Sequence, residues 1–349
     1  LRNKMTVYDN PVFFRRGCAI VNSEKWSETE TTEREILQEM KYQNIIENMT
    51  LKEKAAFLSG KSEWQTRDFP RLDIPAIFCS DGPNGVRKQA GAGDHLGINP
   101  AVPATCLPTA AAMANSWDEE LEQKVGVALG EESMEEEVNV LLGPGLNIKR
   151  NPLCGRNFEY YSEDPYVSGK IAAAMTKGVQ KHRGKGTTIK HFAVNNQEDN
   201  RYFVNAHVSE RALREIYLKG FEIAVREAQP LSIMTSYNLL NGIHTANSHD
   251  LIQGMARDEW GFKGVVMTDW FTSQDMPMIT GKFKPAYPIS ASTGCIYAGN
   301  DIQMPGCQKN VDDIVEAVKT GKEIDGYKIT KADLQFNAAN VIRVVARTM

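Results

Sequence analysis

The sequence predicts an α/β protein in which residues 41–349 form one (β/α)8-like TIM-type barrel, with a doubly wound sheet as the alternative. Two observations favour the barrel. Apolar, strand-like runs alternate with amphipathic, helix-like runs along most of the chain, as repeated strand and helix units require. Glycine-rich phosphate signatures are missing, because the turn at 143–145 has neither dinucleotide-binding spacing nor a Walker lysine. The prediction leaves room for irregular first strands.

The predicted strands are short apolar runs bounded by glycine or polar residues. They fall at residues 76–80, 138–142, 187–189, 202–208, 231–236 and 264–268. Four of these runs lead directly into side chains that can bind a ligand or take part in catalysis. They are Asp81, the pair Lys190 and His191, Tyr237, and Asp269. Because the carboxyl ends of parallel strands meet on one face of a barrel, these side chains should converge. An enzyme is therefore the leading hypothesis.

Helices are expected between these strands, where apolar residues recur with the helical period. Thr50 is the predicted N-cap of a helix over residues 51–58, and this role explains the Asn48-Met49-Thr50 sequon better than glycosylation does. The other predicted helices cover residues 118–137, 164–182, 210–228, 250–260, 311–320 and 331–345. A segment at 294–304 follows the strand that carries Asp269.

Residues 1–40 look unlike the rest and are predicted to be an arm or linker. They combine an aromatic and basic stretch at 12–16 with a polar run at 27–35. The first residue is Leu1, which suggests a processed chain or a piece of a longer product, and no signal peptide can be read. We expect a cytoplasmic location, or a secreted one if a signal peptide lies upstream of Leu1.

Composition argues against several kinds of partner. The 349 residues are 42% hydrophobic and 24% charged, an ordinary globular balance. The formal net charge of -4 gives no basic field for nucleic acid, and no window approaches the roughly 18 apolar residues of a membrane helix. The six cysteines lack the spacing of a disulfide framework or a zinc site. We expect reduced cysteines in apolar surroundings, among them Cys79, Cys106 and Cys295, with no metal and no other cofactor.

Four segments, taken together and in this order, resemble glycoside hydrolase family 3: residues 80–87, 150–165, 190–192 and 268–270. The Ser-Asp-Gly-Pro form of the first segment is similar to the β-glucosidase branch, and the helix starting at 49–54 resembles the family's usual entry into its barrel. The resemblance implies a retaining, exo-acting β-glucosidase with Asp269 as nucleophile. Such an enzyme releases terminal non-reducing β-D-glucose from a β-glucoside or cello-oligosaccharide by double displacement.

The polar strand ends have the chemistry of a clamp on one terminal sugar. A carboxylate at Asp81 can accept hydrogen bonds from paired hydroxyl groups, and four other side chains can donate to the remaining hydroxyls: Arg87, Arg156, Lys190 and His191. The resemblance places Asp81 at the far end of the sugar ring and the last three donors at its middle hydroxyls.

The resemblance also implies that Tyr237 hydrogen-bonds Asp269 and that Trp270 forms an apolar wall for the sugar or for the next subsite. Met234 either lines the bottom of the sugar pocket or packs in the hydrophobic core. Simpler interpretations remain open for some residues. Asp81 lies among turn-forming residues, His191 could be an ordinary core histidine, and Arg150 is expected to form a structural ion pair.

Two features depart from the family pattern. Residues 190–196 lack the catalytic histidine of the branch that hydrolyses N-acetylglucosamine links, so that branch is disfavoured. Family β-glucosidases also take a general acid/base glutamate from a second α/β domain, and nothing in the chain resembles that domain. We therefore expect the glutamate to come from outside these residues. The missing domain would precede Leu1, form a separate chain, or have been removed.

Other functions stay open at this stage. The same clamp could belong to a non-catalytic glucoside-binding subunit, or to a related family activity such as a β-xylosidase. A barrel enzyme of different chemistry, such as a phosphorylase or a lyase, fits the polar residues less well. The sequence does not decide whether the protein forms a homo-oligomer.

Overall fold

The computed structural model describes residues 33–91, 93–94, 98–275 and 287–349. The chain divides into two units, residues 1–48 and 49–349. Helix α1 (Glu33–Glu47) is the described part of the first unit. Most of the predicted arm, residues 1–32, lies outside the described residues, so the boundary at residue 40 stays a prediction. The remaining description concerns the second unit.

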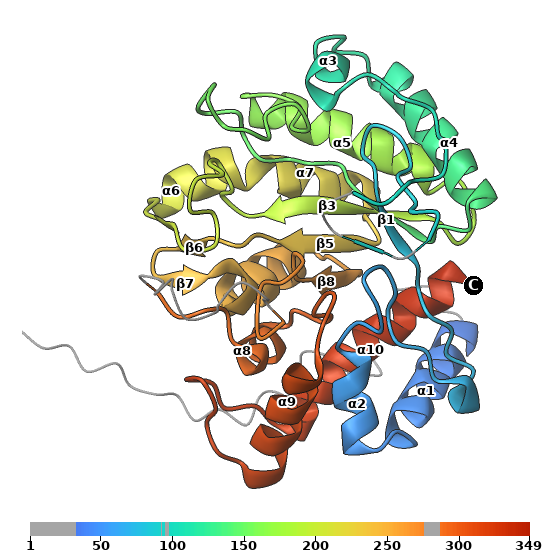
Figure 1. Ribbon diagram of the computed structural model, residues 1–349, viewed down its shortest axis with the longest axis vertical. Coiled ribbons are helices and arrows are strands. Elements are labelled where there is room, and N and C mark those ends of the chain that lie inside the picture. The colour runs from blue at the N-terminus through green and yellow to red at the C-terminus, as the bar shows by residue number, and fades with distance from the viewer. Residues whose placement is uncertain (1–32, 92, 95–97, 276–286) are drawn as a thin grey trace, which may run out of the picture. The chain divides into compact units, whose positions relative to one another are not determined.

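Five parallel strands form the centre of the second unit, in the order β1, β2, β3, β5 and β8 (Figure 1). Their bounds are Cys79–Asp81, Val140–Leu142, Gly186–Phe192, Ser232–Thr235 and Val265–Met267. All their residues are buried except Asp81, which is half-buried at the end of β1. Since each strand is covered on both faces, a continuous apolar run is the pattern to expect. Five of the six predicted strands are therefore confirmed as members of this sheet.

Short bridges close this sheet into a ring. Met267 of β8 bridges Ile302 in parallel, and Gln303 bridges Ser59 in parallel. The circuit then returns to β1 through an antiparallel bridge between Gln65 and Phe78. The predicted α/β fold with a barrel-type parallel sheet is thus confirmed. The first segments contribute isolated bridges and not full strands, in line with the expected irregularity.

Helices α4, α5 and α7 lie together along one side of the sheet in Figure 1. They span Glu119–Glu135, Pro165–Val179 and Lys219–Ala228. Glycines let them approach closely: a Cβ at Gly126 of α4 would lie 2.4 Å from the Met175 carbonyl oxygen of α5. A Cβ at Gly169 of α5 would lie 2.7 Å from the Ile223 side chain of α7. A larger residue at either glycine would force the helices apart.

Helices α2, α8, α9 and α10 lie on the other side of β8 in Figure 1. They span Leu51–Phe57, Ser292–Ala298, Gln308–Thr320 and Lys331–Thr348. The predicted cap of α2 is confirmed, because the Glu53 amide donates to the Thr50 hydroxyl at 3.2 Å and the Thr50 amide donates to the Glu53 carboxylate at 2.7 Å. This reciprocal pair satisfies two amides that the first helical turn leaves without partners. Short helices occur at Pro70–Leu72, Ala110–Ala114 and Thr245–Asn247.

Three sequence predictions differ from the structure. The helix predicted at 210–228 is interrupted, since α6 (Glu210–Ala212) and α7 flank a π-helical turn at Leu213–Tyr217. The helix predicted at 250–260 is π-helical over Asp250–Glu259. The strand predicted at 202–208 shrinks to β4 (Asn205–Ala206). Strand β4 pairs outside the barrel with β6 (Leu239–Leu240), which in turn pairs with β7 (Ile243–His244).

A buried polar cluster around Asp301 holds the backbone of β8 at Val266. The Asp301 carboxylate accepts from the Val266 amide at 2.7 Å, from Arg257 at 2.5 Å and from the Asn340 amide of α10 at 2.9 Å. Asp301 is completely buried, and burial raises its pKa to about 6 although Arg257 opposes the rise. Such a charge is tolerated in a core only when its hydrogen bonds are satisfied.

The cysteines among the described residues are free. Cys79 and Cys295 are buried, as expected, but Cys106 is exposed, so the prediction of apolar surroundings is wrong at that position. Within the described ranges, no helix is both long and apolar enough to cross a membrane. The same ranges hold no cluster of three metal-ligating side chains.

Candidate active site

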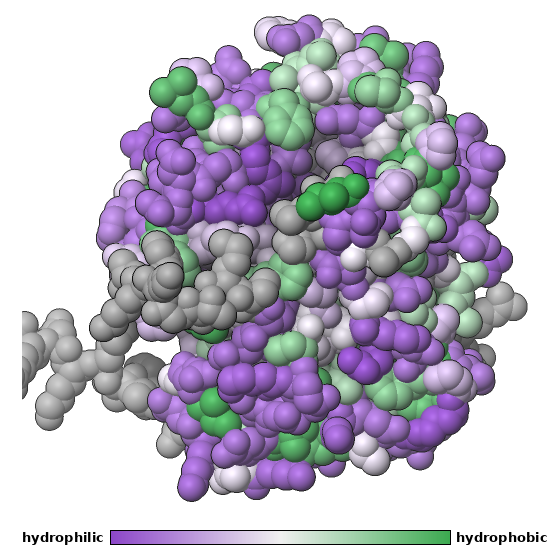
Figure 2. Space-filling model, in the orientation of Figure 1, coloured by the Kyte–Doolittle hydropathy of each residue, from purple (hydrophilic) through white to green (hydrophobic). Residues whose placement is uncertain are grey.

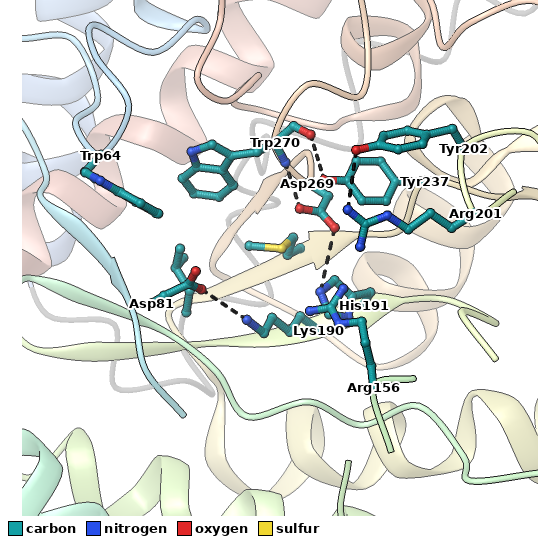
Figure 3. Close-up of a pocket in the computed structure, with 12 residues that line it drawn as sticks. Trp64, Asp81, Arg156, Lys190, His191, Arg201, Tyr202, Tyr237, Asp269 and Trp270 are labelled. Atoms are coloured by element: carbon teal, nitrogen blue, oxygen red, sulfur yellow. Dashed lines mark hydrogen bonds and ion pairs between the residues drawn. The ribbon is translucent and has the colours of Figure 1, made fainter. Parts of the chain in front are cut away.

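A cavity of about 170 Å³ lies at the carboxyl ends of the parallel strands (Figure 3). Twelve residues line it: Trp64, Asp81, Leu142, Arg156, Lys190, His191, Arg201, Tyr202, Met234, Tyr237, Asp269 and Trp270. All the candidate residues from the sequence are among them except Arg87. Strand ends that are far apart in the chain therefore do converge on one polar site.

Asp269 follows β8 and is 8% exposed. Its Oδ1 accepts the Trp270 amide at 2.7 Å, and its Oδ2 lies 3.7 Å from Nε2 of His191. Burial raises the pKa of Asp269 above its usual value, whereas the charges of Arg156 and Arg201 oppose that rise. The surrounding positive charges favour the ionised carboxylate, which is the form that can act as a nucleophile.

Lys190 lies near the end of β3 and is only 3% exposed. Its Nζ is 3.3 Å from the Asp81 carboxylate and 4.0 Å from Glu159. Asp81 keeps about a third of its side chain exposed, so it can still accept hydrogen bonds from a ligand. Arg87 does not line the cavity. It returns beside Asp81 through a backbone bridge, with its guanidinium 3.9 Å from the Asp81 carboxylate.

Two guanidinium groups reach the cavity from the segments that follow β2 and β3. Arg156 forms an ion pair with Glu159 and lies 4.0 Å from Glu198. Arg201 is 3.0 Å from Glu198 and lies 4.8 Å above the ring of Tyr237. Glu198 thus holds both cations in fixed positions. In Figure 3, Arg201 lies beside Tyr237 on the opposite side of the cavity from Trp64.

Aromatic side chains form much of the remaining wall. Trp270 donates its ring N–H to the Glu63 carbonyl at 2.7 Å, and its ring lies 5.5 Å from that of Trp64. Tyr237 donates its hydroxyl proton to the Trp270 carbonyl at 2.7 Å, so this proton is directed to the backbone beside Asp269. Burial raises the pKa of Tyr237 well above its usual value, which keeps the phenol protonated.

The backbone of His191 is clamped by Asn147. The Asn147 side chain donates to the His191 carbonyl at 2.9 Å and accepts from the His191 amide at 2.8 Å. The imidazole is buried, and burial lowers its pKa well below the usual value, assisted by the nearby charges of Arg156 and Lys190. His191 is therefore neutral at physiological pH and carries one ring proton.

Four lining residues were missed by the sequence interpretation: Trp64, Leu142, Arg201 and Tyr202. Leu142 closes a predicted strand, so its place at the strand end could have been inferred. Trp64 and Arg201 belong to loops. Loops lack the periodic hydrophobic pattern of helices and strands, so the sequence does not indicate where their side chains point. Tyr202 fell within a predicted strand. Arg150 lies outside the lining and donates to the Tyr217 hydroxyl at 3.0 Å.

The carboxylates of the site were also located. Of the residues that the structure describes, only Asp81 and Asp269 contribute carboxylates to the cavity lining, and no glutamate does. Two glutamates near the cavity, Glu159 and Glu198, are paired with arginine.

The face of the protein seen in Figure 2 is mostly hydrophilic, with hydrophobic side chains scattered across it.

Comparison with known proteins identifies the family. Residues 19–344 match the model of the glycosyl hydrolase family 3 N-terminal domain. The chain is 48% identical over 279 residues to thermostable β-glucosidase B of Acetivibrio thermocellus, covering 80% of this chain and 35% of that protein. It is 44% identical over 304 residues to an exo-α-(1→6)-L-arabinopyranosidase of Bifidobacterium breve, covering 87% and 37%.

Solved structures agree. The fold matches β-glucosidase 3B of Thermotoga neapolitana in complex with glucose, with a TM-score of 0.76 and 38% identity over 88% of this chain and 42% of that one. The chain belongs to glycoside hydrolase family 3, as the sequence motifs indicated. It spans little more than a third of the length of the two curated relatives described above.

Proposed function

We propose that this chain carries the nucleophile and the sugar clamp of a retaining, exo-acting β-glucosidase. The observation that supports this most directly is the position of Asp269. Its carboxylate is buried at the end of β8, is surrounded by positive charge, and still faces the cavity. That arrangement suits a carboxylate that must stay ionised and attack a sugar carbon.

In the proposed reaction, the terminal glucosyl unit occupies the cavity with its anomeric carbon toward Asp269. The carboxylate oxygen bonds to that carbon while the bond to the leaving oxygen breaks, and a general acid gives a proton to the leaving oxygen. Water then attacks the same carbon, releases Asp269 and yields β-glucose, with the former acid accepting the water proton. Asp81 and Lys190 hold the sugar through its hydroxyls during both steps.

The acid/base is proposed to come from outside these 349 residues, from a second α/β domain or from another chain. A retaining mechanism needs a second carboxyl group roughly 5 to 5.5 Å from the nucleophile. No glutamate lines the cavity in the described part of the chain, and Asp81 is already engaged by Lys190. The complete active site would then form only when the second part joins the cavity.

Covalent trapping tests this proposal without the missing acid. An aryl 2-deoxy-2-fluoroglucoside with a dinitrophenyl leaving group needs no proton on departure, and the fluorine slows release of the glycosyl intermediate. After incubation, intact-mass spectrometry should show one added fluoroglucosyl group. The Asp269→Asn variant should show none. A chain that gains no mass, or gains it equally without Asp269, contradicts the proposal.

Two other functions deserve a direct comparison. A sugar-binding subunit would bind glucose without forming the covalent adduct. A pentopyranosidase is favoured by the similarity to a protein named as an arabinopyranosidase. Parallel trapping with fluorinated glucoside, xyloside and arabinopyranoside reagents distinguishes them, and faster trapping by a pentoside would reassign the substrate.

A further inference from the structure

Tyr160 lies behind His191, outside the set of residues that line the cavity. It is 1% exposed, and its hydroxyl is 3.0 Å from Nδ1 of His191. The two rings meet edge to face, with centroids 6.1 Å apart. Gly145 makes room for this ring, because a Cβ there would lie 2.7 Å from Tyr160 Cδ1. The contact is thus built into the core.

The direction of the hydrogen bond follows from the neighbours of Tyr160. The Asn195 side-chain nitrogen lies 3.0 Å from the Tyr160 hydroxyl oxygen and 3.1 Å from the Glu198 carboxylate. A carboxylate only accepts, so the NH₂ group of Asn195 must face Glu198 and must also donate to Tyr160. The hydroxyl oxygen of Tyr160 therefore accepts from Asn195, and its own proton is free to be donated to His191.

We propose that Tyr160 is a positioning residue that fixes His191 in the tautomer with its proton on Nε2. With Nδ1 accepting the phenol proton, the single ring proton of the neutral imidazole must be on Nε2. This nitrogen faces the cavity, 3.7 Å from Oδ2 of Asp269. At that distance the N–H makes no direct hydrogen bond to the carboxylate, so it is available to a ligand in the cavity.

The opposite tautomer would damage the site in two ways. It would point the Nε2 lone pair at the Asp269 carboxylate, which would be repulsive. It would also remove the donor from the cavity and leave the Tyr160 hydroxyl proton without Nδ1 as its acceptor. Burial raises the pKa of Tyr160, so the phenol keeps the proton that it donates. Donation from Nε2 to a sugar hydroxyl rests on the proposed function, but the tautomer itself does not.

Nitrogen NMR of the 349-residue chain labelled with ¹⁵N-histidine measures the tautomer without any substrate. The two ring nitrogens of a neutral histidine give well-separated shifts, depending on which one carries the proton. The His191 signal is assigned by its loss in His191→Gln. In the unsubstituted protein, we expect the proton on Nε2 and a hydrogen-bonded Nδ1. A proton on Nδ1, or on both nitrogens, would overturn the proposal even if the Tyr160 variant does not fold.

The charge of Asp269 also favours a proton on Nε2, so the contribution of Tyr160 is measured in an Asp269→Asn background. There, His191 should keep its Nε2 proton. Adding Tyr160→Phe should raise the ratio of the Nδ1–H form to the Nε2–H form about tenfold, as expected for loss of one buried hydrogen bond. An unchanged ratio would show that Tyr160 does not set the tautomer.

Tyr161→Phe in the same background is the matched control. Tyr161 is similarly buried, but its hydroxyl donates to Glu122 at 2.7 Å and not to His191. The Tyr161→Phe substitution also removes a buried tyrosine hydroxyl, but it should leave the His191 signals unchanged. A similar change in both phenylalanine variants would mean that general loosening of the core, and not the Tyr160 bond, moves the proton. Failure of covalent trapping would leave this result intact, since the two measurements are independent.

Discussion

Nζ of Lys190 lies 3.3 Å from Oδ1 of Asp81, although 109 residues separate them in the chain. The parallel sheet brings them together, because β1 and β3 both pair with β2 and end at the same edge. Lys190 is buried, whereas Asp81 keeps a partly exposed carboxylate. The lysine therefore holds the carboxylate in place while leaving it accessible to a ligand in the cavity.

Asp81→Ala should weaken glucose binding by about 2 to 4 kcal/mol, because it removes an acceptor for sugar hydroxyls and leaves the Lys190 charge buried without this partner. The loss should appear as a higher glucose inhibition constant in the assembled enzyme. Asp312→Ala, at an exposed position on α9, is the control and should leave the constant unchanged. If Asp81→Ala kept the glucose inhibition constant of the unsubstituted enzyme, Asp81 would not be a sugar-binding residue.

Asp269→Asn should abolish hydrolysis of aryl β-glucosides while preserving the fold. The amide has nearly the same volume as the carboxylate but cannot form the glycosyl intermediate. The measurement is the steady-state rate of the assembled enzyme, with circular dichroism as the check on folding. Turnover close to that of the unsubstituted enzyme would show that another group is the nucleophile.

The isolated chain should discriminate strongly between leaving groups. It should react with dinitrophenyl β-glucoside, whose leaving group needs no proton, but hydrolyse methyl β-glucoside or cellobiose very slowly. Azide, which attacks without a general base, should yield β-glucosyl azide from the trapped intermediate. Rapid cleavage of cellobiose by the isolated chain would mean that it contains its own acid/base.

Glu122 should make stability depend on pH. Burial raises its pKa from 4.5 to about 7, although the bond from Tyr161 opposes the rise. The folded protein therefore holds this proton more tightly than the unfolded chain does. The resulting stabilisation is complete below about pH 4.5 and is lost as the pH rises through 7, an effect of about 3 kcal/mol.

Denaturant unfolding at several pH values between 4.5 and 8 measures this effect. Glu122→Gln should flatten the pH dependence, because the amide keeps the shape of the side chain without titrating. Glu131→Gln, at an exposed position of the same helix, should retain the slope of the unsubstituted protein. Equal slopes for Glu122→Gln and the unsubstituted protein would refute the assignment.

The sequence was most informative where burial is greatest. Runs that lie buried within a parallel sheet are mostly apolar or β-branched, so the strands that lead to Asp81, Lys190 and Asp269 could be located from the sequence. Loop side chains carry no such constraint. Arg201 reaches the cavity because Glu198 holds it, and that pairing depends on the path of a loop.

The π-helical segments were missed for a related reason. Their residues keep an amphipathic pattern close to that of an α-helix, and the extra residue per turn is decided by packing. Similarly, Tyr202 looked like part of a strand because aromatic residues favour strands. Tyr160 was overlooked because its partner, His191, lies in a different motif of the sequence.

The hydrogen bonds of Asp301 connect the last helix, α10, to β8, the strand that leads to Asp269. Asn340 holds one carboxylate oxygen and the Val266 amide holds the other, only three residues before Asp269. A shift of α10 would therefore reach the segment that carries Asp269 through the Asp301 side chain. Loss of the Asn340 contact should therefore disturb the position of Asp269 as well as the stability of the fold.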